Sequence, residues 1–327
     1  MGWKGYIAKK VAITALTLFI LITINFFLFR ILPGDPARLL FKNPKASKEA
    51  LAYIRERFGI DKPLWVQYLI YIRETLVGNF GWSFVYNEPV MNVIARRLPN
   101  TLLLIGSAAV VSTVIGIILG AIAGWKKGTK TDFVIFGFSV ITTWLPSFWV
   151  GIILLLIFGW WLRMFPLGGI TTPAVSYPSV FSYWADVLWH MTLPMVNLLF
   201  WYLGEYVLLM RSSMLDVLAE DYIVTARAKG LKERVILINH AMRNALLPVV
   251  TLTTINLGFV VAGAIQTEIV FSWPGLGRLM YDSLVMRDYP LLQGTFLILA
   301  ICVIAANFFA DLIYGYLDPR IRVRGEE

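Results

Sequence analysis

The sequence predicts an all-α integral membrane protein with six membrane-spanning helices and both termini in the cytoplasm. Hydrophobic residues make up 58% of the 327 residues and charged residues only 15%. So few charges cannot cover a surface in water, but they suit a bilayer, where lipid-facing positions must be apolar. Six stretches also reach the roughly 20 mostly apolar residues that a helix needs to cross the hydrocarbon core.

The six apolar stretches are expected to form the spans in chain order. They cover residues 11–32, 101–124, 133–160, 187–210, 246–271 and 291–316. Pro146 and Pro194 lie inside the third and fourth spans. We expect kinks there rather than breaks, because neighbouring helices can satisfy the carbonyl groups that a proline leaves unpaired. The first stretch is too long for a secretory signal and no cleavage site follows it, so we expect it to stay as an uncleaved span.

The distribution of positive charge predicts the orientation. With the N-terminus inside, the short outer loops carry only Arg163, Arg278 and Arg287. The inner segments then carry a much larger set: Lys4, Lys9, Lys10, Lys126, Lys127, Lys130, Arg227, Lys229, Lys232, Arg234, Arg243, Arg320, Arg322 and Arg324. Short cytoplasmic loops are enriched in Lys and Arg, which favours this orientation. The net charge of +9 suits loops that face anionic lipid. It does not indicate nucleic acid, because the basic residues form no single face.

The long outer segment, residues 33–100, is expected to be an external helical insertion. Ser47 can cap a helix that ends before Gly59, and Asp61 can cap a second helix over residues 63–76. A third short helix is expected over residues 90–98. Their amphipathic patterns predict that they lie at the outer membrane surface. The expected divisions are therefore residues 1–32 (N-terminus and first helix), 33–100 (insertion), 101–316 (core with helices two to six) and 317–327 (cytoplasmic tail).

The inner segment 211–245 is too polar to span a membrane and too patterned to be a linker. Asp221 stands at the start of a short helical pattern, where negative charge suits the helix dipole. Tyr222, Ile223 and Ala226 form an apolar stripe at helical spacing. Gly230 stands where a residue in the left-handed region would end the helix, and a second amphipathic helix is expected over residues 232–245. The pattern alone fits either a helix pair lying on lipid or a helix that docks in the groove of a partner.

This inner segment resembles the coupling loop of ATP-binding-cassette (ABC) importer permeases. The general pattern of that loop is Glu-Ala-Ala, three residues, then Gly. Here Ala226 and Gly230 match in register, while Val224 and Thr225 replace Glu-Ala. The sequences of residues 221–231 (DYIVTARAKGL) and 240–250 (HAMRNALLPVV) resemble those of the dipeptide/oligopeptide, or B-type, permeases more closely than they resemble the general pattern.

Four further stretches resemble the same family, in the same order along the chain: residues 32–36 (LPGDP), 97–101 (RLPNT), 268–277 (EIVFSWPGLG) and 317–320 (LDPR). The resemblance implies a non-catalytic permease subunit in the inner or plasma membrane of a prokaryote. It also implies four kinds of partner: a second homologous permease, two cytoplasmic ATPase subunits, an external substrate-binding protein and membrane lipid. The residues it assigns to ATPase coupling are Asp221, Tyr222, Ile223, Thr225, Ala226, Ala228, Gly230 and His240.

The chain carries no recognisable chemistry of its own. Residues 124–130 (GWKKGTK) lack the spacing and order of a phosphate-binding Walker A loop. We therefore expect ATP and magnesium to be bound by partner ATPase subunits and no cofactor to be bound by this chain. Cys302 is the only cysteine, so no internal disulfide and no zinc-binding spacing exists. No catalytic motif appears, and we expect neither catalytic nor metal-binding residues.

Two acidic residues within expected spans are candidates for the translocation path, because carboxylates inside a membrane are costly. Glu205 lies midway along the fourth span, and Glu268 lies near the end of the fifth. The alternative is that either carboxylate pairs with a hydroxyl or amide of another helix. The cargo also stays open between peptides, oligosaccharides and nickel. Two further classes, a secondary transporter and an intramembrane enzyme, lack the expected internal repeat or catalytic cluster.

Overall fold

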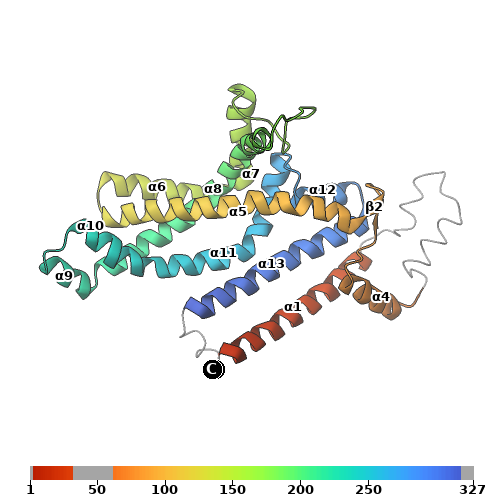
Figure 1. The fold of residues 1–327 in the computed structure, drawn as a ribbon, viewed down its shortest axis with the longest axis horizontal. Helices are drawn as coiled ribbons and strands as arrows, with labels where there is room; N and C mark the ends of the chain where they lie inside the picture. The colour runs from red at the N-terminus through yellow and green to blue at the C-terminus, as the bar shows by residue number, and fades with distance from the viewer. Residues whose placement is uncertain (1–2, 32–61, 318–327) are drawn as a thin grey trace.

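The computed structural model describes residues 3–31 and 62–317, most of which are helical (Figure 1). The elements in chain order are α1 (Trp3–Ile31), α4 (Leu64–Leu76), β1 (Trp82–Ser83), β2 (Glu88–Pro89), α5 (Val90–Trp125), α6 (Lys130–Trp144), α7 (Ser147–Leu154), the π-helical turns η1 (Leu155–Trp161), α8 (Val180–Leu218), α9 (Asp221–Ala228), α10 (Glu233–Val235), the π-helical turns η2 (Ile236–Met242), α11 (Arg243–Val270), α12 (Leu276–Val285) and α13 (Tyr289–Leu317).

The described residues contain four helices long and apolar enough to cross a membrane: α1, α5, α8 and α13. The pair formed by α6 and the α7–η1 segment would be a fifth span, bent by 105°. Helix α11, 28 residues long, stands where the fifth span was expected. The prediction of an all-helical membrane protein is confirmed. Figure 1 shows the long helices running between α9 at one end and the β-hairpin with α4 at the other.

The close packing of α5 against α8 forms the centre of the fold. Gly116, Gly120 and Gly124 recur at intervals of four along α5, which puts them on one face. A Cβ atom added at Gly120 would lie 2.6 Å from Cβ of Met210 and 2.7 Å from the carbonyl oxygen of Val207. Small residues at such positions let two membrane helices approach to backbone contact, so these glycines allow α5 and α8 to pack as a tight pair.

The third expected span contains a break, so the expected kink at Pro146 was wrong. Helix α6 ends at Trp144, α7 begins at Ser147, and the two axes differ by 105°. Leu145 is extended at φ −75° and ψ 131°, because a proline disfavours the helical conformation in the residue before it. Pro194, in contrast, lies inside the uninterrupted helix α8.

Two other elements extend beyond their expected ends. The helix expected over residues 90–98 continues through Pro99 to Trp125 as a single helix. Its residues Val90 and Ile94 are fully buried in a cluster with residues of α12 and α13, so this face packs on protein, and the position of the helix at the outer membrane surface stays a prediction. Helix α8 runs on to Leu218, and therefore includes the start of the segment expected to be an inner loop.

The outer insertion is partly described. Helix α4 confirms the helix expected over residues 63–76, whereas the helix expected between Ser47 and Gly59, and its neighbouring cap Asp61, lie outside the described residues. Tyr68 of α4 shares a 2.7 Å hydrogen bond with Thr23 of α1, and Tyr71 accepts one of 2.8 Å from Asn25. These contacts hold α4 against the end of α1.

Candidate functional site

Helix α9 is the short helix expected within residues 211–245, the inner segment that resembles the coupling loop. Its carboxyl end is closed by two backbone hydrogen bonds: Gly230 N–H donates to the Arg227 oxygen at 2.9 Å, and Leu231 N–H donates to the Ala226 oxygen at 3.4 Å. Gly230 has φ +74°, as expected for a residue that ends a helix in the left-handed region. A side chain at Gly230 would meet no atom within 4 Å, so the backbone conformation alone favours glycine here.

The apolar stripe of α9 faces this chain itself. Ile223 is fully buried and Ala226 is 5% exposed, and both belong to one cluster with Met214, Ile236 and Ala241. These two residues were assigned to ATPase coupling from the resemblance. Their burial means that they hold α9 on the permease, and a partner would meet the opposite face.

The outward face of α9 carries most of the other assigned residues. Asp221, Thr225, Ala228 and Gly230 are exposed. Val224 is 59% exposed, although it was not assigned. Tyr222 is partly exposed, and its hydroxyl accepts a 2.7 Å hydrogen bond from Asn244 Nδ2. The exposed face is therefore a mixed apolar and polar surface about two helical turns long.

The second half of the segment continues into α11. The helix expected over residues 232–245 is instead a continuous run of α10, η2 and α11 that passes through Pro248. His240 is half-buried in the π-helical turns, and its carbonyl oxygen accepts a 3.4 Å hydrogen bond from Asn244. A groove of about 340 Å³ opens beside it, lined by Ile238, Asn239, Met242, Arg243 and Leu246.

Two arginines, Arg227 and Arg211, connect the inner segment 211–245 to other helices of the bundle. Arg227 of α9 lies 3.4 Å from the carboxylate of Glu233 and stacks 5.9 Å from the ring centre of Trp125, at the end of α5. Arg211 of α8 makes two hydrogen bonds of 2.6 and 2.9 Å to Asp132 of α6. The contact between Arg211 and Asp132 was not predicted from the sequence, because partners 79 residues apart leave no local pattern.

Glu205 and Glu268, the two acidic candidates for a translocation path, lie in opposite environments. Glu205 is exposed on α8. Glu268 is fully buried: it accepts a 2.7 Å hydrogen bond from Thr101 Oγ1 and one of 3.1 Å from the Arg278 backbone at the start of α12. The expectation that Glu268 faces a path is therefore wrong, because its carboxylate caps a helix inside the chain.

Hydrogen bonds around Glu268 bring together in space two of the stretches that resemble the family, residues 97–101 and 268–277. Thr101 Oγ1 accepts a 2.7 Å hydrogen bond from Leu276 N–H. Asn100 donates to the Pro274 oxygen at 2.9 Å, and its own carbonyl accepts from the Trp273 indole at 3.0 Å. Residues 97–101 and 268–277 thus form one interlocked joint between α5, α11 and α12.

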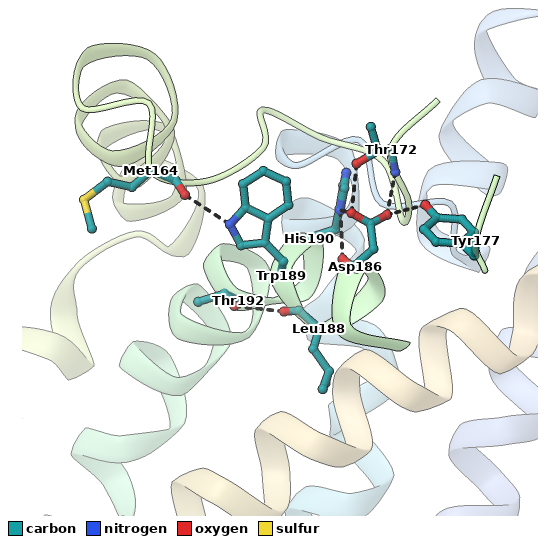
Figure 2. Close-up of polar contacts among 8 residues, drawn as sticks. All are labelled: Met164, Thr172, Tyr177, Asp186, Leu188, Trp189, His190 and Thr192. Atoms are coloured by element: carbon teal, nitrogen blue, oxygen red, sulfur yellow. Dashed lines mark hydrogen bonds and ion pairs between the residues drawn. The ribbon is translucent and has the colours of Figure 1, made fainter. Parts of the chain in front are cut away.

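A second carboxylate, missed in the sequence, organises the segment before α8 (Figure 2). Asp186 accepts hydrogen bonds from the Thr172 backbone at 2.7 Å, the Thr172 hydroxyl at 2.8 Å and the Tyr177 hydroxyl at 2.6 Å. The bond from Tyr177 raises the pKa of that hydroxyl. His190 packs beside Asp186, with Nδ1 2.9 Å from its carbonyl oxygen. The cluster pins residues 172–177 onto the first turns of α8.

The described part of the chain contains no cluster of side chains suited to bind a metal ion. No group of three or more His, Cys, Asp or Glu side chains lies close enough together there to hold an ion.

Comparisons with known proteins agree with the helical membrane architecture. The family model for the inner membrane component of binding-protein-dependent transport systems matches residues 116–323, and the model for the N-terminal part of such components matches residues 4–105. The chain is 36% identical to the dipeptide transport system permease protein DppB of Lactococcus lactis, over 97% of this chain and 99% of the relative. It is 36% identical to the oligopeptide transport system permease protein AppB of Bacillus subtilis, with the same coverage.

A third relative, the dipeptide transport system permease protein DppB of Escherichia coli K12, is 37% identical over 97% of this chain and 98% of its own length. These matches run from end to end and cover both halves of the fold. The chain therefore belongs to the family of inner membrane components of binding-protein-dependent transport systems, the permease subunits of ABC importers.

Proposed function

We propose that this chain forms half of the translocation pathway of an ATP-driven importer of dipeptides and oligopeptides. The observation that carries the proposal is the end-to-end similarity to permeases named for dipeptides and oligopeptides. These names favour peptides over the oligosaccharide and nickel alternatives. The family also argues against a secondary transporter or an intramembrane enzyme, since its members work in binding-protein-dependent systems.

The proposed topology has six spans with both termini in the cytoplasm of a prokaryote, in its inner or plasma membrane. Helix α11 and the broken α6–α7 pair supply the two spans beyond the four unbroken candidates. The charge asymmetry of the short loops supports this orientation, which puts α9 inside and the β-hairpin outside. The division into residues 1–32, 33–100, 101–316 and 317–327 is kept as an organisational proposal, although α5 crosses the boundary at residue 100.

The proposed assembly contains a second homologous permease, two cytoplasmic ATPase subunits and an external substrate-binding protein. The ATPase subunits bind ATP and magnesium, and this chain performs no catalysis. They are proposed to dock on the outward face of α9 and on the groove beside His240, with Tyr222, Val224, Thr225 and Ala228 in direct contact. Ile223 and Ala226 act from behind by fixing α9 to the bundle. Glu205 remains the candidate for the translocation path.

Two neighbouring residues of α9 provide the test, because Ile223 is buried and Val224 is exposed. Val224→Glu adds a charge to the exposed face, so we expect the permease to stay folded while it loses the ATPase subunits, since an unpaired charge in a desolvated contact is costly. Ile223→Ala removes buried apolar volume, so we expect it to destabilise the permease itself, by about 2–5 kcal/mol.

The measurement is co-purification of ATPase subunits with the tagged chain from its native host, together with ATP-dependent uptake of a labelled dipeptide. Membrane abundance and melting temperature of the permease are recorded for both variants. Normal ATPase recovery and normal uptake with Val224→Glu would show that the outward face of α9 is not the docking surface.

A further inference from the structure

In the proposed topology, the break between α6 and α7 lies at membrane depth. Helix α6 has 15 residues, about 22 Å at the helical rise of roughly 1.5 Å per residue. It begins at Lys130, directly after the basic loop that carries Lys126 and Lys127. Because a bilayer core is about 30 Å thick, a helix that starts at the inner interface ends within the hydrocarbon region. Trp144, Leu145 and Pro146 therefore interrupt the helix where backbone groups have no water.

The break brings two unlike helix ends together. The last turn of α6 presents carbonyl groups and the negative end of a helix dipole, and the first turn of α7 presents N–H groups and the positive end. Trp149 and Val150 both donate to the Pro146 carbonyl, at 3.1 and 3.2 Å. Within the described chain, no side chain caps the start of α7. Leaving such groups in lipid costs several kcal/mol each, so the break requires protein, water or cargo against it.

Polar side chains from two other helices surround the same point. Ser147, the first residue of α7, donates a 2.9 Å hydrogen bond to the exposed Gln266 of α11. Asn197 of α8 is 1% exposed and donates to Thr267 at 2.9 Å. Its Oδ1 has no hydrogen-bond partner in the described chain. That oxygen lies 3.4 Å from where a Cβ of Gly151 would stand, one turn into α7. This buried acceptor lies behind α7, inside the protein, so Ser147 and the exposed Gln266 are the polar side chains that a ligand at the break could reach.

Aromatic rings complete the surroundings. Trp144 at the end of α6 is largely exposed, and Phe148 and Trp149 in the first turn of α7 are half-exposed. Such rings offer apolar surface to varied side chains without demanding one shape. The combination of main-chain polar groups with unspecific apolar surface matches a chain of peptide units rather than a single rigid molecule.

We propose that the α6–α7 break, with Ser147 and Gln266, contacts the main chain of a peptide as it crosses the membrane. The inference rests on the proposed function and adds the place and chemistry of contact. Peptide N–H groups or a terminal ammonium would meet the carbonyl end of α6. Peptide carbonyls or a terminal carboxylate would meet the N–H end of α7 and the amide of Gln266. Recognition through the main chain is independent of side-chain sequence.

The test is protection of a cysteine in the complete transporter, reconstituted in nanodiscs so that both sides are accessible. Ser147→Cys is placed in a Cys302→Ala background, with Gln266→Cys as a second reporter in case the first fails to fold. Val110→Cys is the matched control, because Val110 lies on the outward face of α5 and is 64% exposed. A charged, water-soluble methanethiosulfonate reagent reports contact with water, and alanine peptides from the dipeptide to the pentapeptide serve as cargo.

We expect the reagent to modify Ser147→Cys or Gln266→Cys but not Val110→Cys, and we expect loss of that modification when a transported alanine peptide is added with ATP. Amidation of the peptide's carboxyl terminus should weaken the protection. Labelling no faster than at Val110→Cys, or labelling that peptides leave unchanged while peptide uptake is intact, would overturn the contact site and leave the proposed function standing. Absence of uptake for every alanine peptide by the wild-type transporter would overturn both.

Discussion

Replacement of Gly120 by alanine tests whether α5 and α8 form a rigid pair through backbone contact. The added Cβ would lie 2.6 Å from Cβ of Met210 and 2.7 Å from the Val207 carbonyl oxygen. Carbon atoms pack at about 3.5–4.0 Å, so the two helices would have to separate by roughly 1 Å at this point. Val207 presents a backbone atom, which cannot move aside by changing rotamer.

The expected magnitude is set by two opposing effects. Alanine improves helix propensity over glycine by up to about 1 kcal/mol. Overpacking of a well-filled contact costs about 1–3 kcal/mol. Gly106 is the matched control, because it lies on the same helix, is exposed, and has nothing within 4 Å of its added Cβ. Gly106→Ala should therefore be neutral or stabilising, and Gly120→Ala should be less stable than Gly106→Ala by about the overpacking cost of 1–3 kcal/mol.

The assay is the melting temperature of the purified permease in detergent, followed by tryptophan fluorescence, with membrane abundance as a second reading. Gly120→Val should be worse than Gly120→Ala, since a branched side chain deepens the overlap. If Gly120→Ala and Gly106→Ala melt at the same temperature, the helices can separate freely and the α5–α8 contact is not a rigid element of this fold.

Two further outcomes are expected from the carboxylates of Glu268 and Asp186. Glu268→Gln should lower the melting temperature, because the amide nitrogen cannot accept the hydrogen bond from Arg278 or Thr101 and leaves a buried donor unpaired, at a cost of about 1–3 kcal/mol. Asp186→Asn should speed hydrogen exchange at Thr172, whose amide donates to that carboxylate, and equal exchange rates in the variant and the wild type would show that the cluster in Figure 2 does not hold this segment.

Much of the helical layout could be predicted from the sequence because each span carries a local signal. Apolar length predicts α1, α5, α8 and α13, and a glycine after a short amphipathic pattern predicts the end of α9 at Gly230. Both signals arise from residues close together in the chain. They do not depend on which surface the helix meets.

The faces of these helices were less predictable, because burial depends on neighbours that are distant in sequence. The same stripe of Ile223 and Ala226 fits a partner's groove or this chain's own core, and only the position of Met214 and Ile236 decides between them. The charge of Glu268 suggested a path, whereas Thr101, 167 residues away, makes it a structural cap. Pro146 and Pro194 are alike as residues in an apolar run, and only one breaks its helix.

The buried stripe of α9, Ile223 and Ala226, explains how a movement of α9 would reach the rest of the permease. A helix held only by a partner could rock without moving the permease, but α9 shares a core with Met214 of α8 and contacts Trp125 of α5 through Arg227. Helices α5 and α8 approach to backbone contact at Gly120 and Gly124, and Arg211 ties α8 to α6 through Asp132. We therefore expect a displacement of α9 by an ATPase to carry the inner halves of α5, α6 and α8 as one body. The break after Trp144 is then the first place where that body can bend relative to α7, because no helical hydrogen bonds cross it.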